Sequence, residues 1–332
     1  MTVLVTGGAG YIGSHTVRAL RGAGYDVVVL DTLENGHASL IDGVPLVVGD
    51  TADDEVVGQL LRDHAVDAVV HFAAYKAAGE SMHEPGKYFR NNTAGALKLI
   101  ETVLAHGVRR FVFSSTAAVY GTPERVPVRE DAPLHPESPY GESKLMVEKI
   151  LQWFDVAHDM GSVSLRYFNA AGASMDGAIG EDWSQTANLV PLVMKAALER
   201  TGPLKVFGTD YPTPDGTAIR DYIHVEDLAE AHVKALGYLV AGGASTAVNL
   251  GTGVGTSVKE VLDTTEELAG TRVPRTYVGR RAGDPVELWA DNSRAREILG
   301  WEPVYGVPEI IGSAWRWHSS DPDRFSRGAL AD

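Results

Sequence analysis

The sequence of 332 residues has no cysteine, no long apolar run and no excess of basic residues. Without cysteine, the chain cannot form disulfides, thiolate zinc sites, iron–sulfur clusters or a cysteine nucleophile. Its 29 basic against 44 acidic residues argue against general nucleic-acid binding but leave room for a local anion site. No run approaches the ~18 apolar residues of a membrane span, and the first residues lack the charged start of a signal peptide. We therefore expect a soluble, cytoplasmic protein with no membrane, nucleic-acid or metal partner.

The first half of the chain alternates between strand and helix patterns. Apolar runs with strand character lie at 3–6, 26–30, 45–48, 68–72, 111–113 and 163–165, and helical patterns separate them at about 53–64, 92–106 and 140–158. Continuous apolar strands are typical of a parallel sheet that is buried on both faces. The alternation predicts an α/β fold with a Rossmann-type, doubly wound parallel sheet over residues 1–169.

The second half differs in composition and pattern, because glycine, proline and aspartate become frequent and strands no longer alternate with helices. Helical patterns remain near 188–200 and 227–240, with a short strand candidate at 205–207. We expect a smaller, mixed α/β C-terminal substrate domain over 170–332, with the chain returning to the first domain around 222–250. The length fits two domains at roughly 150 residues each.

A glycine pattern follows the first predicted strand. Gly7, Gly10 and Gly13 permit a tight turn, the approach of a phosphate to the backbone, and close packing of helix and strand. The helix that follows offers unpaired N–H groups to a pyrophosphate. Asp31 ends the second strand, where a carboxylate accepts hydrogen bonds from ribose hydroxyls and repels a 2′-phosphate. The pattern predicts a dinucleotide site that prefers NAD, the alternative being a plain glycine turn with a solvated aspartate.

Tyr140 and Lys144 are four residues apart, and Pro139 before them suits the start of a helix. On one helix face they favour proton transfer to and from an alcohol. A phenol has a pKa of ~10, and lowering it by ~3 units needs about 4 kcal/mol, which a lysine cation ~4 Å away supplies. Thr116 closes the triplet that begins at Ser114, at the end of a strand, where its hydroxyl can relay the proton. An exposed helix face and a helix cap are the alternative interpretations.

Longer stretches make a family resemblance specific. They are the glycine turn at 7–13, His71 to Ser81, Ser114 to Gly121, Tyr140 to Lys144, Leu165 to Asn169, Tyr211 to His224 and Arg281 to Asp284. Together they resemble the UDP-glucose (UDP-galactose) 4-epimerase family of the extended short-chain dehydrogenase/reductase superfamily, over about residues 2–318. The resemblance implies reversible epimerisation at C4 of UDP-galactose and UDP-glucose. A hydride passes from C4 to bound NAD, the 4-keto sugar turns its other face, and the hydride returns.

The resemblance also assigns roles to residues. It makes Tyr140 the base, Thr116 the proton bridge and Lys144 the group that lowers the pKa of the phenol. To the three glycines and Asp31 it adds a cofactor set: Tyr11, Ile12, Asn35, Asp50, Thr51, Phe72, Ala73, Ala74, Lys76, Asn91, Ser114, Tyr140, Lys144 and Tyr167. The UDP-sugar substrate is assigned to Lys76, Thr116, Tyr140, Asn169, Asn188, Leu189, Phe207, Arg220, Arg281, Asp284 and Leu288. Arg220 and Arg281 suit a pyrophosphate on physical grounds, although surface salt bridges are the simpler interpretation.

Two positions depart from the family pattern. Thr116 stands where many members have serine, and it keeps the hydroxyl. Leu288 falls where a large tyrosine closes the sugar pocket in some epimerases and a small residue opens it in others. A UDP-N-acetylhexosamine, UDP-pentose or UDP-glucuronate substrate therefore stays open. A 4,6-dehydratase needs an acid and a base beside the threonine, and Ala117 and Ala118 argue against it. A non-catalytic nucleotide-sugar and NAD-binding protein is the remaining alternative.

The helical patterns at 92–106 and 140–158 carry apolar stripes. They can pack on the chain's own sheet. The resemblance implies in addition a two-fold interface of four helices, so we expect a homodimer.

Overall fold

The large parallel sheet dominates the computed structural model, which describes residues 1–184, 186–281 and 284–325. Its seven strands run in the order β11-β6-β5-β4-β1-β2-β3, and all neighbours pair in parallel. The chain changes direction across the sheet between β1 and β4, where ligands bind in folds of this type. The predicted fold class is confirmed. The strands are β1 (Thr2–Thr6), β2 (Asp26–Asp31), β3 (Leu46–Val48), β4 (Val66–His71), β5 (Arg110–Thr116), β6 (Gly161–Tyr167) and β11 (Thr246–Leu250).

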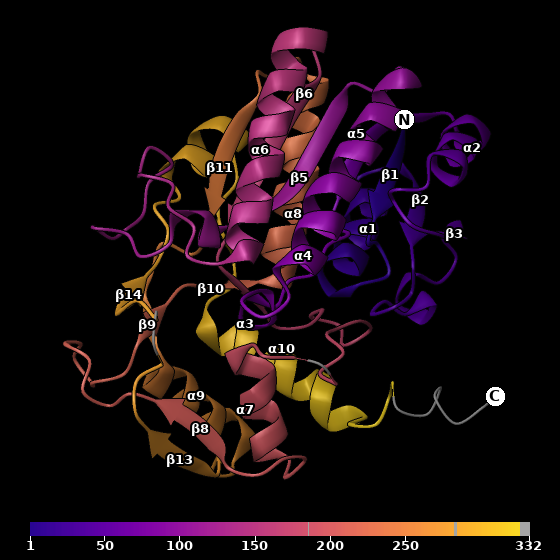
Figure 1. Cartoon of the computed structure of the whole chain (residues 1–332). Helices are drawn as coiled ribbons and strands as arrows, with labels where there is room; N and C mark the ends of the chain where they lie inside the picture. The colour runs from indigo at the N-terminus through magenta and orange to yellow at the C-terminus, as the bar shows by residue number, and fades with distance from the viewer. Residues whose placement is uncertain (185, 282–283, 326–332) are drawn as a thin grey trace.

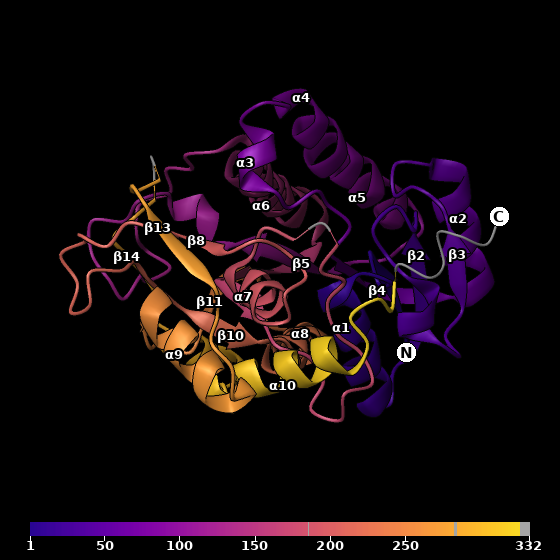
Figure 2. The same ribbon diagram turned by 90° about the horizontal axis from the view of Figure 1, so that it is seen from below.

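Helices cover both faces of this sheet. Along β1, Val3 and Val5 face one core and Leu4 faces the other, because successive side chains of a strand point to opposite faces. One core is closed by α1 and α8 and the other by α2, α5 and α6, as the end-on view shows (Figure 2). These helices are α1 (Tyr11–Gly22), α2 (Asp54–His64), α5 (Ala96–Ala105), α6 (Pro139–His158) and α8 (Val225–Val240).

Local chemistry sets where these helices begin. Asp53 caps α2 by accepting from the N–H groups of Glu55 and Val56, and Ser138 caps α6 by accepting from Gly141. The helix expected at 92–106 is present but starts earlier, since α4 (Pro85–Tyr88) continues through a π-helical turn (Phe89–Gly95) into α5, and the short α3 (Ala78–Ser81) precedes it. Asn92 explains the turn, because its side chain bonds the backbone of Tyr75 and the hydroxyl of Ser143.

The rest of the chain forms a smaller lobe below the C-terminal edge of the sheet (Figure 1). Its core joins Trp183 and Tyr222 to apolar residues of three helices. From the return segment expected at 222–250, α8 packs on the large sheet and β11 joins its edge. The lobe's elements are β7 (Asn169–Ala171), α7 (Leu189–Ala197), β8 (Leu204–Phe207), β9 (Ile219–Arg220), β10 (Tyr222–His224), β12 (Thr256–Ser257), α9 (Val258–Ala269), β13 (Arg275–Val278), β14 (Glu287–Leu288) and α10 (Val307–Ser320).

Candidate active site

A tight glycine turn joins β1 to α1 at the C-terminal edge of the sheet. Gly7 has a φ of +69°, and a Cβ atom there would lie 2.7 Å from the backbone nitrogen of Ala73. A Cβ atom on Gly13 would lie 2.2 Å from the carbonyl oxygen of Gly7, so only glycine allows this packing. No side chain caps α1 at Gly10. The N–H groups of the first turn, which includes Tyr11 and Ile12, are therefore free to face an anion.

The Asp31 carboxylate lies beside this turn at the end of β2. Its Oδ2 accepts from the N–H of Ala9 at 2.9 Å, and its Oδ1 accepts from the N–H of Leu33 at 2.9 Å. Each oxygen keeps a second acceptor position for a ribose hydroxyl. The negative charge beside the turn disfavours a 2′-phosphate, so turn and carboxylate together fit NAD.

The other predicted cofactor residues gather at the same edge of the sheet, because the strands are parallel and in register there. His71 at the end of β4 pairs with Thr6 of β1 and with Phe113 of β5. The hydroxyls of Ser114 and Tyr167 bond to each other across β5 and β6. Of the rest, Asn35 follows β2, Asp50 and Thr51 follow β3, Phe72, Ala73, Ala74 and Lys76 follow β4, and Asn91 lies in the π-helical turn.

The proton-transfer candidates meet at the start of α6. Lys144 is 3% exposed, and its Nζ donates to the carbonyl oxygen of Ser114 at 2.8 Å. Burial lowers the pKa of Lys144 to about 7. Burial raises the pKa of Tyr140 above its ordinary value, and a hydrogen bond to Thr116 partly opposes that rise. The chain alone therefore keeps the Tyr140 phenol protonated, and the predicted lowering of its pKa requires a further positive charge.

A cavity of about 230 Å³ opens in the smaller lobe, where residues of β7, α7, β8 and β9 line it. Within it, the Arg220 guanidinium lies 3.5 Å from the Asp284 carboxylate, and the Arg281 guanidinium lies 4.3 Å from the centre of the Phe207 ring. The start of α7 also opens into it and has no side-chain cap at Asn188, which favours an anion. Seven predicted substrate residues line this cavity: Asn169, Asn188, Leu189, Phe207, Arg220, Arg281 and Asp284.

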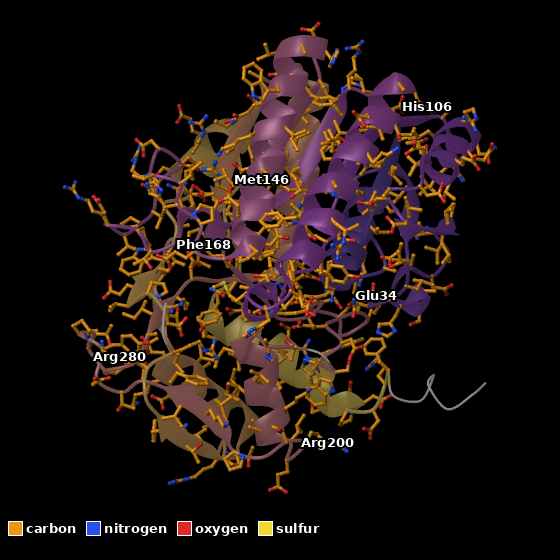
Figure 3. The ribbon with its side chains drawn as sticks, viewed as in Figure 1. Glu34, His106, Met146, Phe168, Arg200 and Arg280 are labelled. Atoms are coloured by element: carbon orange, nitrogen blue, oxygen red, sulfur yellow. The ribbon has the colours of Figure 1, made fainter. Side chains whose placement is uncertain are left out.

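Leu288 connects this cavity to the proton-transfer residues. It pairs with Arg220 in the register of β14 and β9. Its side chain packs on the cluster that holds Ala117 and Leu145, the neighbours of Thr116 and Lys144. Phe168 belongs to the same cluster and lies where the two lobes meet (Figure 3).

Sequence reasoning missed a buried ion pair that fixes α6 to the sheet. Arg166 of β6 donates from Nε to Glu148 of α6 at 3.0 Å and from Nη2 at 2.6 Å. The Arg166 Nη1 also bonds the Tyr120 hydroxyl at 2.9 Å. Arg166 lies within the quoted stretch 165–169, but nothing in the spacing pointed to Glu148. A second missed carboxylate is the buried Glu181, whose Oε1 lies 3.4 Å from Nζ of Lys76.

The described residues also bear on other partners. No group of three or more His, Cys, Asp or Glu side chains there is arranged to hold a metal ion. None of the helices described has the length and apolar content needed to cross a membrane. The cytoplasmic location and the homodimer stay predictions.

Comparison with known proteins assigns the family. The profile of the NAD dependent epimerase/dehydratase family matches residues 3–251. The chain is 49% identical to a UDP-glucose 4-epimerase of Lacticaseibacillus casei, over 98% of this chain and 99% of that one. The structure of UDP-glucose 4-epimerase from Brucella ovis in complex with NAD matches with a TM-score of 0.93 at 45% identity, over 95% of this chain and 97% of that one. The enzyme from Bifidobacterium longum in complex with NAD+ and UDP matches with a TM-score of 0.92 at 39% identity, over 98% and 100%.

The chain therefore belongs to the NAD dependent epimerase/dehydratase family. Within this family it is similar to UDP-glucose 4-epimerases over nearly its whole length. The predicted family, the enzyme class and the NAD cofactor are confirmed.

Proposed function

We propose that the protein interconverts UDP-galactose and UDP-glucose by reversible epimerisation at C4, with NAD bound throughout. One observation carries the proposal. Leu288 pairs with Arg220 of the arginine-containing cavity and packs on the cluster that holds Ala117 and Leu145, next to Thr116 and Lys144 in the chain, so a nucleoside diphosphate in the cavity can extend its sugar toward the proton-transfer residues. The full-length similarity to UDP-glucose 4-epimerases supports the same reaction.

The residues at the start of α6 would move the proton. The Tyr140 phenol takes the proton from the sugar 4-hydroxyl, and the hydroxyl of Thr116 lies between them as a relay. Lys144 holds its ammonium against the Ser114 carbonyl, one helical turn from Tyr140. When bound, the nicotinamide supplies the redox step by accepting a hydride from C4 and returning it. Because burial raises the pKa of Tyr140, the phenolate becomes accessible only with positive charge nearby.

The cavity would bind the nucleotide. Arg220 and Arg281 neutralise the diphosphate, and the start of α7 adds unpaired N–H groups. Asp284, which faces Arg220, accepts from a uridine ribose hydroxyl. Phe207 and Leu189 supply apolar surface for the base. Because these contacts bind the nucleotide, the sugar itself does not need tight binding contacts.

A coupled assay without added NAD tests the proposal. The purified protein is offered UDP-galactose, UDP-N-acetylgalactosamine and UDP-glucuronate in parallel. We expect turnover of UDP-galactose. If none of the three sugars is turned over after NAD has been added, the result would contradict a 4-epimerase of these substrates and favour a non-catalytic binding protein.

The variant Tyr140→Phe tests the assigned base. We expect kcat to fall by about 10²- to 10⁴-fold, the range of general acid–base catalysis, while NAD stays bound. Tyr277→Phe on the exposed side of β13 is the matched control and should keep full activity. Unchanged turnover in Tyr140→Phe would remove this residue from the mechanism.

A wider sugar range is a second candidate function, and Leu288 favours it. The side chain is half-buried, cannot form a hydrogen bond and is smaller than tyrosine. Leu288→Tyr should therefore reduce kcat/KM for UDP-N-acetylgalactosamine about tenfold more than for UDP-galactose, within the ~1–3 kcal/mol range of pocket selectivity. An equal loss for both sugars would contradict a sugar-lining role.

A homodimer is the assembly we propose. The outward face of α6 carries Met146, which Figure 3 labels, together with Trp153 and Val156. Trp153 is 71% exposed and Val156 is 77% exposed. Their spacing of seven and three residues puts them on one helix face, and large exposed apolar side chains mark interaction sites. Light scattering at micromolar concentration should give twice the chain mass, and Trp153→Glu should give a monomer. A wild-type monomer would contradict the dimer.

A further inference from the structure

Asp221 is a fully buried carboxylate behind the wall of the substrate cavity. It lies between β9 and β10, and its own backbone already binds two predicted substrate residues. Its N–H donates to the carbonyl oxygen of Leu288 at 3.1 Å. Its carbonyl oxygen accepts from the backbone N–H of Asn169 at 3.0 Å and from the side-chain Nδ2 of Asn169 at 2.9 Å. Asp221 also directly follows Arg220, so it adjoins three predicted substrate residues, of which Asn169 and Arg220 line the cavity.

The Asp221 side chain ties two more segments to this point. Oδ1 accepts from the N–H of Thr252 at 2.8 Å and from its hydroxyl at 2.7 Å. Oδ2 accepts from the N–H of Gly253 at 3.2 Å and from the N–H of Ala290 at 3.1 Å. The fit is close, because a Cβ atom on Gly251 would lie 2.3 Å from Oδ2. The carboxylate thus joins the loop after β11 to the segment that follows β14.

All four acceptor positions of this carboxylate are used by the protein, so none is left for a substrate. We propose that Asp221 is a positioning residue, which holds Arg220, Leu288 and Asn169 at a fixed separation and so sets the affinity of the cavity for the nucleotide. This inference rests on the proposed function, since it concerns the same cavity. Asp221 acts through its neighbours and does not touch the reacting atoms.

The variant Asp221→Asn tests the proposal, because the amide turns an NH₂ group toward backbone N–H donors while keeping the shape. We expect the Kd for UDP, measured calorimetrically on the NAD-loaded enzyme, to rise about tenfold, which corresponds to 1.4 kcal/mol. The KM for UDP-galactose should rise in parallel, kcat should change less than threefold, and the NAD content should be unchanged. A purely structural role would lower the unfolding temperature without this split between KM and kcat.

The chain offers a matched control in Asp227. This carboxylate is also buried and accepts from the N–H groups of Val304 and Tyr305, both at 3.0 Å, but it lies on α8 and not in the cavity. Asp227→Asn should lower stability and leave the Kd for UDP within twofold of wild type. An equal rise in Kd for both variants would overturn the proposal, as would a Kd within twofold of wild type in Asp221→Asn.

A milder pair of variants keeps the proposal testable if Asp221→Asn fails to fold. Thr252→Val removes one donor to Oδ1, and Thr252→Ser retains it. We expect the Kd for UDP to rise about threefold in the first and to stay at the wild-type value in the second. Equal values in the two variants would overturn the proposal. Failure of the wild-type protein to bind UDP at all would instead contradict the proposed function.

Discussion

Three buried histidines should make the folded protein sensitive to mild acid. His15, His224 and His232 are at most 3% exposed, and burial lowers the pKa of each to about 4. Nδ1 of His15 and Nδ1 of His232 each lie 2.8 Å from a backbone carbonyl oxygen, so each Nδ1 carries the proton. Among the described residues, the Nε2 atoms of these two rings have no hydrogen-bond partner. On His232 a second proton would therefore reach a buried atom with no acceptor.

The loss of stability follows from linkage. An unfolded histidine has a pKa near 6.5 and takes up its proton first, so stability is complete above that value and is lost as the pH falls from about 6.5 toward 4. Between pH 7.0 and 5.5 each ring lowers the free energy of unfolding by about 1.2 kcal/mol, and the three together lower it by about 3.7 kcal/mol. That sum is a large part of the ~5–15 kcal/mol of a typical protein.

Urea unfolding at the two pH values, with saturating NAD, measures this loss. The informative quantity is the difference between wild type and His232→Gln, because other titrating groups contribute equally to both. We expect the loss between pH 7.0 and 5.5 to be about 1.2 kcal/mol smaller in the variant. His83→Gln, at an exposed position, is the control and should match wild type. The same loss in His232→Gln as in wild type would refute the reasoning.

Two further predictions concern the sheet and the cofactor turn. Glu148→Gln leaves the buried Arg166 without its anion and should lower the free energy of unfolding by about 3–5 kcal/mol in denaturant titration. The control Asp263→Asn, in the exposed pair with Lys259, should lower it by less than ~1 kcal/mol. Similar losses in the two variants would argue against a stabilising role of the buried pair. Gly13→Ala puts a Cβ atom 2.2 Å from a carbonyl oxygen and should deplete NAD in the purified protein, measured by absorbance after denaturation. Gly237→Ala, with open space around it, should retain NAD.

The sequence was most informative in the first half of the chain, where strand and helix patterns alternate. Strands such as β1 and β2 are buried on both faces and therefore appear as unbroken apolar runs, which predicted the parallel sheet. The smaller lobe offered no such signal, because β9, β12 and β14 have two residues each and cannot show a period. The π-helical turn before α5 also left no sequence signal, since it depends on the binding of Asn92 to Tyr75 and Ser143 rather than on any helix-breaking residue.

In the site, too, local patterns were predicted from the sequence and contacts between distant residues were not. Glycine turns and the Tyr140–Lys144 spacing are local patterns, so the sequence alone predicted them. The partners of Asp221 at Thr252 and Ala290 are 31 and 69 residues away along the chain, and no local pattern reports such distances. The burial that lowers the pKa of Lys144 is likewise a property of the packed sheet edge.

The two parts of the proposed site, the cavity and the surroundings of Thr116 and Lys144, differ in their chemistry. On the side proposed for the nucleotide, Arg220 and Arg281 offer fixed charges, and the proposed contacts with the diphosphate do not depend on which face of the sugar points inward. Toward Thr116 and Lys144 the surroundings are apolar, because Leu288 and Phe168 belong to one hydrophobic cluster. An apolar surface forms no directional bonds that would lock a single orientation of the ring. A 4-keto sugar tethered by its diphosphate can therefore present either face, which is what inversion at C4 requires.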